Sequence, residues 1–104
     1  MRKRRYEILL PHTHNDGSPV APEKFLQTRD DIVAQFGAVS LSPHAVIGTW
    51  VHGETRYEDQ TMRLVVDVND TAENRKFFVR LQAKLRKRFD QIEIYVASYA
   101  IDIL

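Results

Sequence analysis

The chain has no cysteine among its 104 residues. Disulfide bonds, thiolate chemistry and sulfur-ligated metal sites are therefore excluded, and stability has to come from packing. Glycine and proline are also scarce, with four residues of each. The glycines stand far apart, at positions 17, 37, 48 and 53, so the sequence contains no glycine-rich loop of the kind that holds nucleotide phosphates.

Long apolar runs are missing as well. Basic residues occupy positions 2–5, and only the short apolar stretch Tyr6 to Leu10 follows them before Pro11. A secretory signal needs a longer apolar core, and a membrane span needs about 20 apolar residues. We therefore expect a cytoplasmic protein that has no membrane partner.

The composition is that of a folded globular protein, with 43% hydrophobic and 28% charged residues. A chain of this length builds one hydrophobic core and not two. We therefore expect a single α+β domain over residues 1–104, in which residues 1–5 form a basic N-terminal arm.

Hydrophobic periodicity predicts the order of the elements. Helical spacing predicts a first helix from Pro22 to about Phe36, ended by Gly37, and a second helix opened by Asp70 as N-cap with Glu73 three residues later. Alternation predicts four strands, over residues 6–10, 46–52, 61–68 and 92–96, with a loop at 12–20 and a long hairpin connection at 53–60. The order β-α-β-β-α-β predicts a ferredoxin-like fold with two helices on one face of a four-stranded antiparallel sheet.

Short segments along nearly the whole chain carry a family resemblance. They are residues 15–19 (Asn-Asp-Gly-Ser-Pro), 22–25 (Pro-Glu-Lys-Phe), 48–50 (Gly-Thr-Trp), 57–59 (Tyr-Glu-Asp), 66–68 (Val-Asp-Val), 70–74 (Asp-Thr-Ala-Glu-Asn) and 88–89 (Arg-Phe). In these segments the chain resembles a family of small, uncharacterised bacterial proteins. The resemblance implies a common fold and supplies no catalytic residue.

His12, His14 and Asp16 alternate just after the first predicted strand. In an extended segment their side chains would share one face, where they could gather a divalent metal such as zinc. However, Asp16 falls in an Asn-Asp-Gly turn, and the best-known sites of this spacing lie in larger barrels that add ligands from distant strands. We therefore assign no catalytic, cofactor-binding or metal-ligating residue, and keep a metal-dependent enzyme using these three residues as a remote alternative.

Positive charge is concentrated in two places, with four of the fifteen cations at positions 2–5 and seven on the second predicted helix. Such a stripe can follow a phosphate backbone, and Arg80, Lys84 and Lys87 are the candidate contacts. The same residues also suit an ordinary solvated helix face, because Lys and Arg are good helix formers and complement the negative end of the helix dipole. A nucleic-acid-associated protein is our second hypothesis.

The sheet face turned away from the helices carries too many apolar residues for a surface left in water. Leu9, Val65 and Tyr95 are predicted to point out from it, together with Trp50. An exposed apolar patch usually marks an interface, so our first hypothesis is a non-catalytic module that assembles as a homodimer through this face. Alternatively, residues 99–104 or the long hairpin fold over the face within the same chain.

Overall fold

The structure is a computed structural model that describes the backbone of residues 1–52 and 55–104, and the side chains of residues 1–43 and 61–104. Its elements follow one another in the predicted order. They are β1 (Lys3–Pro11), α1 (Pro22–Phe36), β2 (Ser40–His52), β3 (Thr55–Asn69), α2 (Ala72–Arg88) and β4 (Tyr95–Ile101). Neither helix is long and apolar enough to cross a membrane.

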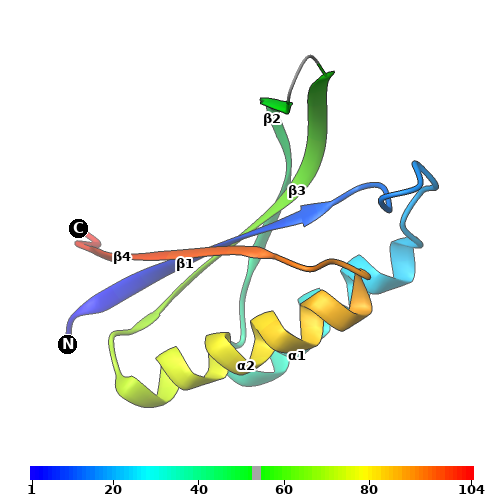
Figure 1. Ribbon diagram of the computed structural model, residues 1–104. Helices are drawn as coiled ribbons and strands as arrows, with labels where there is room; N and C mark the ends of the chain where they lie inside the picture. The colour runs from blue at the N-terminus through cyan, green and yellow to red at the C-terminus, as the bar shows by residue number, and fades with distance from the viewer. Residues whose placement is uncertain (53–54) are drawn as a thin grey trace.

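The four strands form one antiparallel sheet in the order β2-β3-β1-β4. β1 lies between β3 and β4, so that Leu9 stands opposite Arg63 on one side and Tyr95 on the other. Both helices lie on the same side of the sheet (Figure 1). The predicted fold is therefore confirmed as a ferredoxin-like arrangement of two helices on one face of a four-stranded antiparallel sheet.

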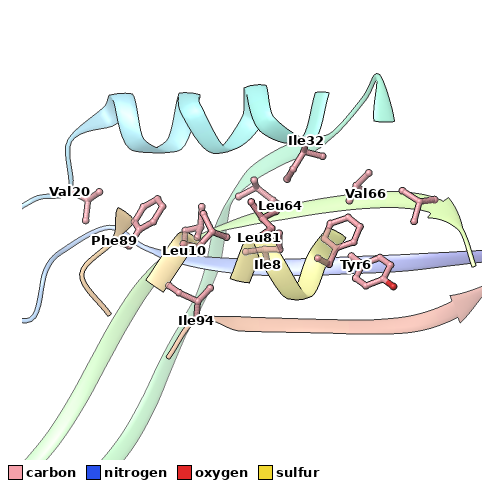
Figure 2. Close-up of a cluster of buried hydrophobic side chains, with 13 residues drawn as sticks. Tyr6, Ile8, Leu10, Val20, Ile32, Leu64, Val66, Leu81, Phe89 and Ile94 are labelled. Atoms are coloured by element: carbon pink, nitrogen blue, oxygen red, sulfur yellow. The ribbon is translucent and has the colours of Figure 1, made fainter. Parts of the chain in front are cut away.

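The core lies between this face and the helices. Every second residue of β1 from Tyr6 to Leu10 is buried, and the same alternation continues in β3 from Leu64 to Val68. The helices supply Ile32 from α1 together with three buried residues of α2, Phe78, Leu81 and Leu85. Figure 2 shows Ile32 and Leu81 lying together with Ile8 and Leu64 of the strands. Alternation in the strands and helical spacing in the helices thus meet in a single apolar layer.

The limits of α1 agree with the prediction. Pro22 occupies the first turn, where a missing N–H group costs nothing. The helix ends at Phe36, and Gly37 follows with a φ of 81° while its N–H group donates to the carbonyl of Val33 at 2.8 Å. Glycine adopts this left-handed conformation without steric penalty, which makes it a suitable C-terminal cap.

The predicted cap of α2 is displaced by one residue. Thr71, and not Asp70, is the N-cap, and its side-chain oxygen accepts a hydrogen bond from the N–H group of Asn74 at 3.2 Å. The carboxylate of Asp70 instead forms an ion pair with Arg4 at 3.0 Å. A partner from β1 therefore takes Asp70 away from the helix end, and threonine serves as the cap.

The second and third strands are longer than predicted. β2 begins at Ser40 and passes through Pro43, which is tolerated because β2 is an edge strand. β3 begins at Thr55, so residues 55–60, predicted to be part of the hairpin connection, are paired with β2. Main-chain pairing with β2 outweighs the polar composition of this segment.

The last strand lies later in the chain than predicted. β4 covers Tyr95–Ile101 in place of residues 92–96, and Ile92, at the start of the predicted strand, is 85% exposed. After α2 the chain first has to return to the sheet, and Phe89 and Ile94 anchor this return in the core. The side-chain amide of Gln82 also donates to the carbonyl of Ile94 at 2.8 Å.

The outer half of the β2–β3 hairpin extends beyond the rest of the sheet. β1 ends at Pro11 opposite Thr61, so the part of the hairpin beyond this point is a ribbon of only two strands. This ribbon, residues 45–52 and 55–60, is called the arm below. The arm rises from the sheet on the side away from the helices (Figure 1). The molecule measures 48 × 26 × 21 Å and has a radius of gyration of 14.6 Å, compared with about 13 Å for a compact domain of this length.

Candidate interaction surface

The open face of the sheet is the surface of β1, β3 and β4 that no helix covers (Figure 1). On β4, Tyr95 is 58% and Tyr99 is 42% exposed. Leu9 of β1 and Val65 of β3 are half-buried on the same face. The structure therefore brings together three of the four residues predicted to form an interface, whereas the side chain of Trp50 lies outside the described residues.

Paired charges cross the middle of the open face. Arg5 donates two hydrogen bonds to the carboxylate of Asp67, at 2.8 and 3.0 Å. Glu7 accepts hydrogen bonds from Arg63 and from the hydroxyl of Tyr99. The sequence signal for these pairs is the alternation of charged residues along β1 and β3, which by itself does not tell which charges meet.

Hydrogen bonds on the open face favour the ionised forms of Glu7 and Asp67. The hydrogen bond from Arg63 lowers the pKa of Glu7 despite the opposing effect of partial burial, and the hydrogen bond from Tyr99 lowers it further. The hydrogen bonds from Arg5 likewise lower the pKa of Asp67. Because each acid has a basic partner beside it, a molecule packed on this face would not bury either carboxylate alone.

Two segments of the same chain, the C-terminal residues 99–104 and the long hairpin, were predicted as alternatives that could cover the open face. In the described part of the chain, neither segment lies over Tyr95 and Tyr99. β4 continues in the plane of the sheet to Ile101, next to β1, and Ile103 and Leu104 beyond it are exposed. The arm points away from the sheet instead of lying flat on it (Figure 1). The described residues thus leave both tyrosines accessible to another molecule.

The cations are divided between paired and exposed positions. Three cations of the predicted basic N-terminal segment lie within β1, namely Lys3, Arg4 and Arg5. Arg4 pairs with Asp70, and Arg5 pairs with Asp67. On α2, Arg88 turns inward to Asp31 and Thr28 of α1, at 2.8 and 2.9 Å. The exposed cations of α2 include the three predicted phosphate contacts, Arg80, Lys84 and Lys87.

The structure does not gather His12, His14 and Asp16 into a metal site. The ring of His12 packs 5.5 Å from that of Phe25. The carboxylate of Asp16 accepts hydrogen bonds from the N–H group and the hydroxyl of Ser18, at 2.9 and 2.6 Å, and these bonds lower its pKa. Over the described part of the chain, no three histidine, aspartate or glutamate side chains are placed to hold a metal ion.

A small pocket of about 110 Å³ opens between α2 and β4. Its floor is the stacked pair of Tyr6 and Phe78, whose ring centroids are 3.9 Å apart. Val79 and Val96 add apolar walls. The remaining lining residues, mostly polar, are Arg75, Gln82, Ala97 and Ser98. No local sequence pattern indicates this pocket, because its shape depends on the pairing of β4 with β1 and on the place where α2 crosses the sheet.

The chain matches no family model, and no curated protein sequence is similar to it. Solved structures nevertheless share its fold. A phage SAM lyase in complex with S-methyl-5'-thioadenosine superposes with a TM-score of 0.65 at 15% identity, covering 97% of this chain and 90% of the lyase. The divalent cation tolerance protein CutA1 of Thermus thermophilus gives a TM-score of 0.61 at 16% identity, covering 97% of this chain and 84% of that protein.

A third similar structure is the divalent ion tolerance protein CutA1 of Ehrlichia chaffeensis, with a TM-score of 0.63 at 4% identity, covering 98% of this chain and 83% of that protein. At such low identities the similarity establishes the fold alone. It supports the β-α-β-β-α-β architecture over nearly the full chain.

Proposed function

We propose that the protein is a non-catalytic assembly module that works as a homodimer, and that the open face of the sheet is part of its interface. The observation that carries this proposal is the exposure of Tyr95 and Tyr99 on a sheet face that no helix, hairpin or C-terminal segment of the described chain covers. Exposed aromatic residues on a continuous surface are typical of protein interfaces.

The chemistry of the open face suits a second copy of the chain. Tyr95 and Leu9 form an apolar pair on neighbouring strands, and the charges beside them are neutralised in pairs, Arg5 with Asp67 and Glu7 with Arg63. Two such faces can therefore pack together without setting unpaired carboxylates against one another. Sheets that pack face to face in this way lie about 10 Å apart.

The activities of the similar structures differ from one another, so they indicate no common ligand for this chain. The proposal therefore rests on the surface itself. Its direct test is the mass of the protein in solution at tens of micromolar, measured by light scattering. Twice the 12.1 kDa of one chain is expected, and a monomer at that concentration would contradict the proposal.

The substitution Tyr95→Lys is expected to weaken the dimer roughly tenfold or more, since tyrosine is enriched among the interface residues whose truncation costs about 2 kcal/mol or more. The lysine would also place a charge beside Leu9, whose other neighbour is Arg63. The measurement is the dissociation constant from sedimentation equilibrium. Leu26→Lys on α1 is the matched control, because Leu26 is 46% exposed and lies away from the open face. Equal effects of the two substitutions would count against the open face as the interface.

A second candidate function is the binding of nucleic acid, favoured by the exposure of Arg80, Lys84 and Lys87 on α2. These three residues lie on the side of the helix opposite its buried stripe of Phe78, Leu81 and Leu85. They can therefore approach a phosphate backbone without any change in the core.

Replacing Arg80, Lys84 and Lys87 together by alanine is expected to reduce the salt dependence of binding to a single-stranded oligonucleotide. Three lost phosphate contacts lower the slope of log K against log salt concentration by about 2, at about 0.7 per contact. Fluorescence anisotropy over a salt series measures this slope. Arg29→Ala on α1 is the control, since Arg29 pairs with Asp30. The absence of any binding at low salt would rule out this function.

A further inference from the structure

The outer edge of β4 lacks the features that keep an edge strand from pairing. Among the strands that the structure describes, β4 pairs with β1 alone, and its segment Tyr95–Ile101 contains no charged residue, proline or glycine. The opposite edge strand, β2, carries Pro43 and a register irregularity between His44 and Gly48, which protect its inner part, whereas residues 48–52 pair with β3 in regular register. Exposed edges in soluble proteins are normally blunted by such devices, so the unprotected edge of β4 is suited to accept another strand.

The pocket between α2 and β4 lies beside this edge. Val96, Ala97 and Ser98 of β4 belong to its lining, and Val79, which is 60% exposed, forms its α2 wall. A strand added to β4 would direct every second side chain to the helix side of the sheet, toward the pocket. Main-chain hydrogen bonds along an edge, together with a pocket for an alternate side chain, are the usual elements of strand addition.

We propose that the edge of β4 binds the arm of a second copy as an additional strand, with an apolar residue of that arm at the pocket. This inference rests on the proposed self-association. Residues 45–51 read Ala-Val-Ile-Gly-Thr-Trp-Val, so the segment offered is apolar and uncharged. β2 is an edge strand, and within the described residues its outer side in the arm pairs with no other strand. A two-stranded ribbon is marginally stable in water, and therefore gains from a third strand.

The direction and length of the arm fit this arrangement. The arm rises on the side of the sheet away from the helices, which is the side of the open face (Figure 1). A second copy packed on the open face would have its sheet about 10 Å away. Residues 45–52 span roughly 26 Å at about 3.3 Å per residue, which is enough to cross this distance and pair with several residues of β4.

Charge favours the arm over a second β4 as the added strand. Two β4 edges paired with each other would bring two copies of α2 close together, and α2 carries seven cations and one acid. Like charges at such an approach repel one another. The arm strand over residues 45–52 has no lysine, arginine, aspartate or glutamate, and therefore adds no such repulsion.

Single cysteines test the pairing directly, because the natural chain has none. Ala100→Cys marks the exposed end of β4, Thr49→Cys marks the arm, and Val33→Cys on α1 is the control. The variants are expressed singly and in pairs, and treated with a short bismaleimide. A product of twice the chain mass is expected when Ala100→Cys is co-expressed with Thr49→Cys, and not with Val33→Cys.

Two outcomes of the cross-linking would overturn the inference. Efficient linkage of Ala100→Cys alone would show that two β4 edges pair with each other. No linkage between Ala100→Cys and Thr49→Cys, in a protein whose mass is that of a dimer, would show that copies associate without the edge. A monomeric wild-type protein would instead contradict the proposed function itself, so the two failures are distinguishable.

A matched pair of valine substitutions tests the role of the pocket. Val79→Glu places a charge at the wall of the pocket, whereas Val33→Glu makes the same change at an exposed position of α1. Val79→Glu is expected to weaken self-association at least tenfold relative to Val33→Glu, with both variants retaining the far-ultraviolet circular dichroism of the wild type. Equal association of the two folded variants would show that the pocket takes no part.

Discussion

Phe78→Ala is expected to lower the free energy of unfolding by about 3–5 kcal/mol, which is a large share of the about 5–15 kcal/mol that stabilises a typical domain. Phe78 is buried where β1, α1 and α2 meet. Its ring stacks on Tyr6 and lies 5.4 Å from Phe36 and 5.2 Å from Phe77, measured between ring centroids. Alanine would remove all of these contacts at once. The cavity left behind would stay open, because the strands on one side of it are held in the sheet and cannot move in to fill it.

Urea denaturation followed by circular dichroism measures this loss. Leu26→Ala on α1 is the control, because nearly half of the Leu26 side chain is already in water and its truncation should cost less than about 1 kcal/mol. A loss for Phe78→Ala as small as that of Leu26→Ala would mean that the aromatic cluster does not hold the helices to the sheet.

Arg88→Ala is expected to destabilise the fold by about 1–3 kcal/mol, because Arg88 joins the two helices through hydrogen bonds to a charged and a neutral partner. One guanidinium nitrogen donates to Asp31 at 2.8 Å and the other to Thr28 at 2.9 Å. The side chain of Arg88 is only 13% exposed, and Thr28 is fully buried. Removing the arginine would leave both partners facing a gap between the helices.

A double-mutant cycle isolates the contribution of this pair. Arg88→Ala, Asp31→Ala and the double variant should show a coupling free energy of about 0.5–3 kcal/mol. Arg88→Lys should retain part of the stability, since a lysine can keep one partner but lacks the planar fork that reaches two. The exposed pair of Arg29 and Asp30 is the control and should show less coupling. Coupling no larger than in the control would indicate that Arg88 does not join the helices.

The fold was predictable because its signals are local and periodic. Alternation from Tyr6 to Leu10 and the proline and glycine at the two ends of α1 depend on neighbouring residues alone, and both predictions are confirmed. The cap of α2 was predicted wrongly because Asp70 has a partner in Arg4, which is distant in the sequence. The start of β3 was missed for a related reason, since its polar residues form a strand only through pairing with β2.

The candidate surface was partly predictable for the same reason. The period of two along a strand assigns Leu9, Val65 and Tyr95 to one face without knowledge of the register. The pairing of Glu7 with Arg63 and Tyr99 requires the register of three strands, which no local pattern supplies. The pocket beside β4 depends in addition on where α2 crosses the sheet.

The place of β1 at the centre of the sheet has a consequence for how the protein is made. β1 is synthesised before both of its partner strands, since Lys3 at its start pairs with Asn69 and Ile101. Its apolar residues therefore have no complete sheet to join until β4 has left the ribosome. Contacts between such distant parts of a chain slow folding, so β1 keeps its apolar residues exposed while the segment from α1 to β4 is synthesised.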